Sequence, residues 1–173
     1  MLDVAVADAE YQQDGEAPKL RAALERSPGA APFSGPVACF GGWGHVWPGE
    51  PATALEVLGE ARRLGRRFGF QRLPTLGGLG LGLAAVQAGR DEDALLHAEE
   101  GLRLSANYPT LHRIRAAACA WLGRDDEARE AVAEALRLGP DDAISTGRAR
   151  SGYADTPATR RWFEGLRRAG LRE

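Results

Sequence analysis

Apolar residues recur at intervals of three and four positions over most of this 173-residue chain, which is the spacing of one face of an α-helix. The pattern predicts helices over residues 51–67, 91–104, 110–122 and 125–138. The segment 73–88 carries no charge and is apolar on every side, which predicts a helix buried on more than one face. The chain is therefore predicted to be all-α.

The segment 123–138 repeats the segment 89–104 at a distance of 34 residues along the chain. The shared positions are Gly89/Gly123, Arg90/Arg124, Asp91/Asp125, Ala94/Ala128, Glu100/Glu134, Leu102/Leu136, Arg103/Arg137 and Leu104/Leu138. Weaker copies begin at Gly15 and Gly49, again 34 residues apart, whereas Gly49 and Gly89 are separated by 40. Self-similarity at a fixed period is typical of stacked helical repeats, here with one insertion.

Helix signals are weaker toward the N-terminus. Residues 3–13 and 16–26 are predicted to be helices, and the Ser- and Pro-containing run 27–32 then breaks the pattern. Residues 37–47 are predicted to be helical despite three glycines, each of which costs about 1 kcal/mol in a helix interior. We expect burial of the aromatic residues in this segment to compensate.

The tail, residues 143–173, has seven arginines and three acidic residues and therefore a local net charge of +4. Residues 145–152 are predicted to form an irregular crossing. Thr156 followed by Pro157 is the pattern of a helix start, so a helix is predicted over 157–169. Its apolar face consists of Trp162, Phe163, Leu166 and Ala169. We predict that this helix caps the open end of the repeat stack, as every such stack requires.

The composition of the chain excludes some classes of partner and structure but does not indicate a function. The net charge of −2 and the sequence pI of about 6.0 give no reason to expect nucleic acid or an anionic membrane as a partner. Two cysteines are too few for a disulfide framework, and the first residues lack the basic and apolar regions of a signal peptide. The expected location is cytoplasmic, with no membrane span.

The repeated residues resemble the tetratricopeptide repeat (TPR), a helix-turn-helix unit of 34 residues, with the best match over 75–142. The matching positions are Leu81, Gly82, Gly89 and Ala94 in one unit and Ala116, Gly123, Ala128, Ala135 and Pro140 in the next. Gly101 and Arg115 depart from the pattern, where alanine and leucine are usual, and this puts the tightness of packing in question.

The resemblance implies a right-handed superhelical stack of about four helix-turn-helix repeats with a C-terminal capping helix. The repeat array would cover residues 1–142, and the basic tail would follow over 143–173. The implied units span about 1–34, 35–74, 75–108 and 109–142.

Two further resemblances concern the setting of the array. Residues 24–30 and 61–65 resemble the repeat arrays of large bacterial ATP-binding transcriptional regulators. Residues 153–155 and 163–171 are similar to the tail of repeat segments fused to bacterial class III adenylate cyclases. Both families combine the array with a catalytic or DNA-binding domain. The resemblances imply a part in bacterial signalling, either as a detached interaction segment or as a fragment of a longer protein.

No motif in the chain supports an enzyme. The glycine-rich run 77–82 lacks the lysine and the hydroxyl residue of a phosphate loop, and close helix packing is its simpler explanation. The soft metal ligands are scattered, and only His112 and Cys119 share a predicted helix, whereas a site needs three or four convergent ligands. We therefore expect no catalytic residue, no metal and no cofactor. A site assembled in space from distant residues is the remaining alternative.

A binding groove is implied by the resemblance, because the first helix of each such repeat lines the concave face. The residues at these places are Leu76, Leu79, Leu83, Val86, Thr110, Arg113, Ala117 and Ala120. The lysines and asparagines with which some family members bind C-terminal carboxylates are absent. Our hypothesis is an apolar groove with one cation, Arg113, suited to an amphipathic helix or to the protein's own flanking segment.

The basic tail offers a second candidate surface. Arginines can contact phosphates or an acidic partner, although a solvated helix face is the preferred explanation. The tail arginines concerned are Arg148, Arg150, Arg160, Arg161, Arg167 and Arg168, and the last four, on the predicted helix, are the main candidates.

The sequence therefore leads to a hypothesis of a non-enzymatic scaffold that binds a protein or peptide of unknown identity. The alternative is a regulatory or sensory segment of a transcriptional regulator or nucleotide cyclase that acts in cis, on a flanking domain or through self-association.

Overall fold

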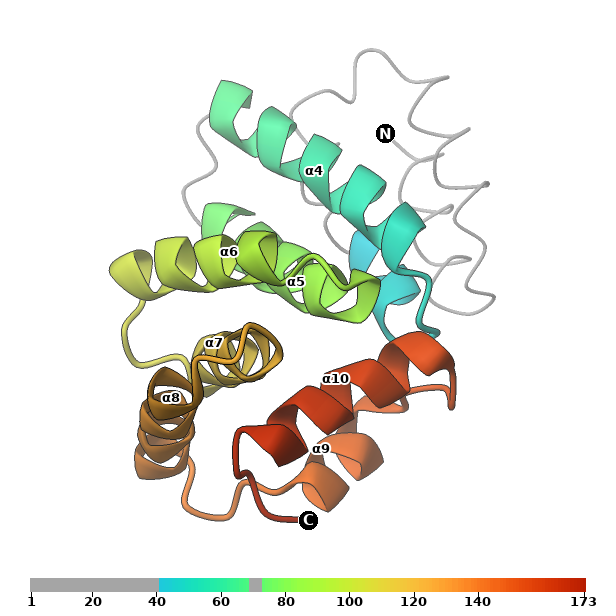
Figure 1. The fold of residues 1–173 in the computed structure, drawn as a ribbon. Helices are drawn as coiled ribbons and strands as arrows, with labels where there is room; N and C mark the ends of the chain where they lie inside the picture. The colour runs from blue at the N-terminus through green and yellow to red at the C-terminus, as the bar shows by residue number, and fades with distance from the viewer. Residues whose placement is uncertain (1–40, 69–72) are drawn as a thin grey trace.

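The structure is a computed structural model that describes residues 41–68 and 73–173. Within these ranges the chain is all-helical and contains no strand. Residues 41–46 are helical, and the helices that follow are α4 (Pro51–Phe68), α5 (Leu73–Ala88), α6 (Asp91–Leu104), α7 (Pro109–Trp121), α8 (Asp125–Leu138), α9 (Ile144–Ser151) and α10 (Pro157–Arg168) (Figure 1).

The helices predicted from apolar spacing between residues 51 and 138 are confirmed, and α10 is confirmed as well. The irregular crossing predicted at 145–152 is wrong, because this segment forms α9. Its sequence has no apolar face, but Thr146 fixes its first turn. The Ala143 amide donates to the Thr146 hydroxyl oxygen at 3.0 Å, and that hydroxyl donates to the Ala143 carbonyl at 2.8 Å.

The predicted helices over 3–13 and 16–26 lie outside the described residues, as do the first four residues of the predicted helix 37–47. The division of the chain into four units consequently stays a prediction.

Each helix from α4 to α8 packs against the next one in the chain, and α5 additionally packs against α7 and α10 (Figure 1). This central position explains why α5 is apolar on every side. The side chains of Leu79, Leu81, Leu83 and Val86 are all buried. Burial of such side chains is the main source of stability for this arrangement, at about 2 kcal/mol for each one removed from water.

Two glycines allow close packing between neighbouring helices. A Cβ atom at Gly82 of α5 would lie 3.0 Å from the Ile114 side chain of α7. At Gly101 of α6, a Cβ atom would lie 2.7 Å from the Leu111 side chain, which is fully buried. The sequence suggested that Gly101 loosens the packing. The structure corrects this, since the missing side chain makes room for leucine.

The same turn connects helices at three places in the chain. At Gly49, Gly89 and Gly123 the backbone has φ values of 78°, 76° and 72°, in the left-handed region that favours glycine. At the last two turns the glycine amide donates to the carbonyl three residues earlier, at 3.2 and 3.3 Å. The next amide donates to the carbonyl five residues earlier, at 2.9 Å in both. The repeated glycine therefore has a conformational reason.

No helix in the described ranges combines the length and the apolar character needed to cross a bilayer.

The left-handed turn predicts opposite effects for two glycine-to-alanine changes. Apart from the adjoining residues and the helix's own backbone, no atom lies within 4 Å of a Cβ atom placed at Gly123 or at Gly59, which is inside α4, so both changes are free of steric clash. Gly123→Ala should lower the free energy of unfolding by roughly 1 kcal/mol, because alanine resists a positive φ. Gly59→Ala should raise it by up to about 1 kcal/mol through helix propensity. Urea denaturation monitored by circular dichroism checks both, and equal effects would contradict the assigned turn.

Candidate functional site

Helix α10 packs against α7 and α5, the two helices that the sequence assigns to the face of a binding groove (Figure 1). It contributes Trp162, Phe163 and Leu166, whose exposed fractions are only 3%, 3% and 2%. The prediction placed this helix over the open end of the stack. In the structure the helix lies across α5 and α7, and its role as the cap of a repeat stack stays a prediction.

Local interactions define the start of α10. The Thr156 side-chain oxygen accepts from the Thr159 amide at 3.2 Å, and the Thr156 amide donates to the Thr159 hydroxyl oxygen at 3.0 Å. Pro157 occupies the first turn, where a helix needs no amide donor. The segment before the helix is held by the Ala154 amide, which donates to the Trp47 carbonyl at 3.0 Å. The N-terminal end of α10 is thereby attached to the turn that precedes α4.

The middle of α10 lies very close to α7, because Gly165 has no side chain. A Cβ atom there would lie 2.7 Å from the Trp121 indole nitrogen and 3.0 Å from the Ala117 Cβ atom. Any larger residue would push the two helices apart.

Arg161 fixes the position of α10 along its groove. Its guanidinium donates to both carboxylate oxygens of Asp91, at 2.9 and 2.7 Å, and to the Val86 carbonyl. It also stacks on the Trp121 ring at 4.3 Å, and the Trp121 indole N–H donates to the Arg161 carbonyl at 3.3 Å. The side chains of Arg161 and Asp91 are only 24% and 11% exposed, so this is a bidentate, partly desolvated ion pair.

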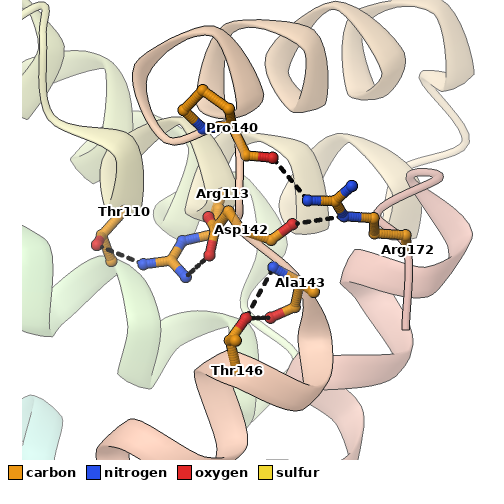
Figure 2. A network of polar contacts seen from close by, with 7 residues as sticks. All are labelled: Thr110, Arg113, Pro140, Asp142, Ala143, Thr146 and Arg172. Carbon is orange, nitrogen blue, oxygen red and sulfur yellow. Dashed lines mark hydrogen bonds and ion pairs between the residues drawn. The ribbon is translucent and has the colours of Figure 1, made fainter.

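A second polar network turns the chain back from α8 toward α9 and α10 (Figure 2). Arg113 donates to Asp142 at 3.1 Å and to the Thr110 hydroxyl oxygen at 2.8 Å. Arg172 donates to the carbonyl oxygens of Asp142 and Pro140, at 3.2 and 2.6 Å. The charge of Arg113 is therefore used inside the protein, where it holds the loop before α9.

The residues of the predicted groove have different environments. Leu79, Leu83, Val86 and Ala117 are buried, and Thr110, Arg113 and Ala120 are half-buried. The Leu76 side chain lies outside the described part of the structure. The groove that the sequence predicts is thus not open. Whether these residues bind a partner stays a prediction.

The four candidate arginines of the tail do not act as one group. Arg161 is committed to Asp91, and Arg168 stacks on Trp121 at 4.0 Å while donating to Glu164 at 3.2 Å. Arg160 and Arg167 lie at the surface in exposed ion pairs. The pKa of Glu164 is lowered by hydrogen bonds from Arg168 and Arg167.

Arg148, one of the tail arginines that the sequence analysis considered, stacks on Phe163 at 4.6 Å. Gly165 and Asp91 were missed as contact residues. A small residue on the apolar face of an amphipathic helix is the signal that could have identified Gly165.

Comparison with known proteins found no match for the chain: no family model, no curated protein and no solved structure matches it.

Removing the negative charge of Asp91 from its pair with Arg161 should lower the stability of the fold. Asp91→Asn leaves the guanidinium partly buried beside a neutral amide and should lower the free energy of unfolding by roughly 2 kcal/mol. Arg137→Gln is the matched control, because it breaks an exposed pair on α8 with exposed fractions of 60% and 41%. It should change stability by less than about 0.5 kcal/mol. Chemical denaturation of both variants checks this, and equal losses would refute the role given to Asp91.

Tyr153 predicts a dependence of stability on alkaline pH. Its ring packs edge-to-face on Phe163 at 5.1 Å, and burial raises the pKa of its phenol to about 12, although the nearby Arg113 opposes the shift. A raised pKa means that the folded state favours the neutral phenol. Its contribution is complete below the unfolded pKa of about 10 and is lost as the pH rises toward 12.

The measurement compares wild type with Tyr153→Phe by urea denaturation between pH 8 and 12. Wild type should lose roughly 2 to 3 kcal/mol relative to the variant over that range. Parallel pH curves for the two proteins would show that Tyr153 ionises freely in the fold.

Proposed function

We propose that this chain is a non-enzymatic protein-interaction module built from stacked TPR-like helical repeats, whose α5–α7 face receives an amphipathic helix. The observation that supports this most directly is α10 itself. An amphipathic helix packs on this face with its apolar side inward, and the groove supplies recognition elements for it. Helix-in-groove binding reads apolar anchors at helical spacing, and Trp162 and Leu166 are four residues apart.

The face combines contacts of three kinds. Apolar surface of α5 and α7 buries the apolar side chains of α10. The Ala117 and Trp121 side chains leave room only for a small residue where α10 crosses α7. The Asp91 carboxylate and the Val86 carbonyl accept hydrogen bonds from a guanidinium group. The partner expected in trans is accordingly a helix with an arginine directly before an aromatic pair and a small residue three positions after the first aromatic. The placement of this module in bacterial signalling is part of the proposal and rests on the resemblances noted in the sequence.

A second candidate is a regulatory segment that acts in cis. The observation that favours it is that the face is already occupied by a helix of the same chain. The two candidates differ in whether a helix supplied in trans can take the place of α10.

The test uses Gly165→Leu, which keeps helix propensity but places a side chain against Trp121 and Ala117 and so disfavours the seated α10. A fluorescein-labelled peptide covering residues 154–173 with the native sequence is titrated into wild-type and variant chains. Fluorescence anisotropy should show binding to the variant on the order of tenfold tighter than to wild type, because the competing helix is weakened.

The matched control is the same peptide carrying Gly165→Leu, which should bind neither chain. Circular dichroism establishes that the variant chain remains helical, and Gly165→Ala provides a milder substitution if it does not. A folded variant that binds the native peptide no better than wild type would exclude helix binding in trans. That result would favour the segment acting in cis.

A further inference from the structure

An open depression of about 480 Å³ lies beside α10, and its lining is strongly basic. Residues from three helices form it: α7, α9 and α10. The lining residues are Trp121, Arg148, Pro157, Arg160, Arg161, Glu164 and Arg167. Four guanidinium groups thus face one carboxylate, on a protein whose overall net charge is −2.

Three of these arginines are available to a ligand. Arg148 is exposed and has no carboxylate partner among the residues that the structure describes. Arg160 pairs with Asp155, but the two side chains are 61% and 81% exposed. Arg167 pairs with Glu164 and Glu173, also at the surface. Such exposed pairs contribute little stability, so an incoming anion can replace the internal carboxylates at small cost.

The fourth arginine has a different part in the depression. Arg161 is held by Asp91, so it forms a fixed part of the wall rather than a group that turns toward a ligand. Its bidentate pair also anchors α10, which means that the wall keeps its shape when the exposed arginines change partners.

The contacts of Trp121 favour one class of ligand over another. Arg161 and Arg168 stack on the Trp121 ring at 4.3 and 4.0 Å, so the aromatic surface is already covered by cations. A nucleobase could stack on Trp121 only after displacing these two arginines. Carboxylate groups could instead bind directly to the guanidinium groups around the depression. The depression is open to the surface, which suits a peptide chain that passes over it.

We propose that this depression, formed by Arg148, Arg160 and Arg167 around Trp121, binds an acidic peptide segment of a partner protein through its carboxylate groups. The site is formed by α10 together with α7 and α9, so it is present while α10 is seated. It does not depend on the proposal that the α5–α7 face receives a helix in trans.

The experiment uses the full chain and a fluorescein-labelled hexaglutamate peptide, with fluorescence anisotropy as the readout. The double variant Arg148→Gln/Arg160→Gln should weaken binding on the order of tenfold, because two charge-assisted contacts are lost. The control Arg129→Gln/Arg137→Gln removes the same charge from exposed pairs on α8 and should change the affinity by less than about twofold. Hexaglutamine should not bind.

Three outcomes would overturn the proposal. The first is that hexaglutamate does not bind wild type. The second is an equal loss of affinity in the two double variants, which would mean attraction to net charge alone. Displacement of hexaglutamate by inorganic phosphate at the same concentration of charge would assign the depression to small anions instead of a peptide. None of these results bears on the exchange of α10, so the two proposals succeed or fail separately.

Discussion

The ion pair between Arg161 and Asp91 is the interaction on which the arrangement of the C-terminal third depends. A slide of α10 by one helical turn would move its apolar anchors by about 5.4 Å and would take Gly165 away from Trp121 and Ala117. A slide would leave a partly buried guanidinium and a buried carboxylate without partners, at a cost of several kcal/mol. The Val86 carbonyl and the Trp121 ring complete the set of groups that Arg161 meets in one register only.

Asp91 takes part both in the start of its own helix and in the tertiary contact with α10. Asp91 opens α6, where an acidic residue in the first turn is favoured by the positive end of the helix dipole. Its counterpart in the next copy of the repeat, Asp125, opens α8 in the same way but is exposed. Both aspartates thus stabilise the start of their own helix, but only Asp91 also binds a residue of the C-terminal tail.

This division explains how much could be predicted from sequence. The helices from α4 to α8 follow from apolar periodicity, and the glycine turns follow from the repeat, because both are local properties of the chain. The contacts of Ala117 with Gly165 and of Asp91 with Arg161 depend on where the tail lies. A single sequence does not specify that position: Trp162, Phe163 and Leu166 indicated an apolar face on α10 but not the surface that it meets.

We expect the contacts made by α10 to give these helices a different kind of cooperativity from that of an open stack of repeats. In a linear repeat array each unit touches only its neighbours, so that units can fray or nucleate independently. Here a tail helix contacts residues 70 and 75 positions earlier, and its leading segment is bonded to Trp47. Loosening of α5 or α6 therefore removes partners of α10, and loosening of α10 exposes residues of α5 and α7. We expect the described helices to unfold as one body and to fold more slowly than an open row of repeats, because contacts over a long loop close slowly.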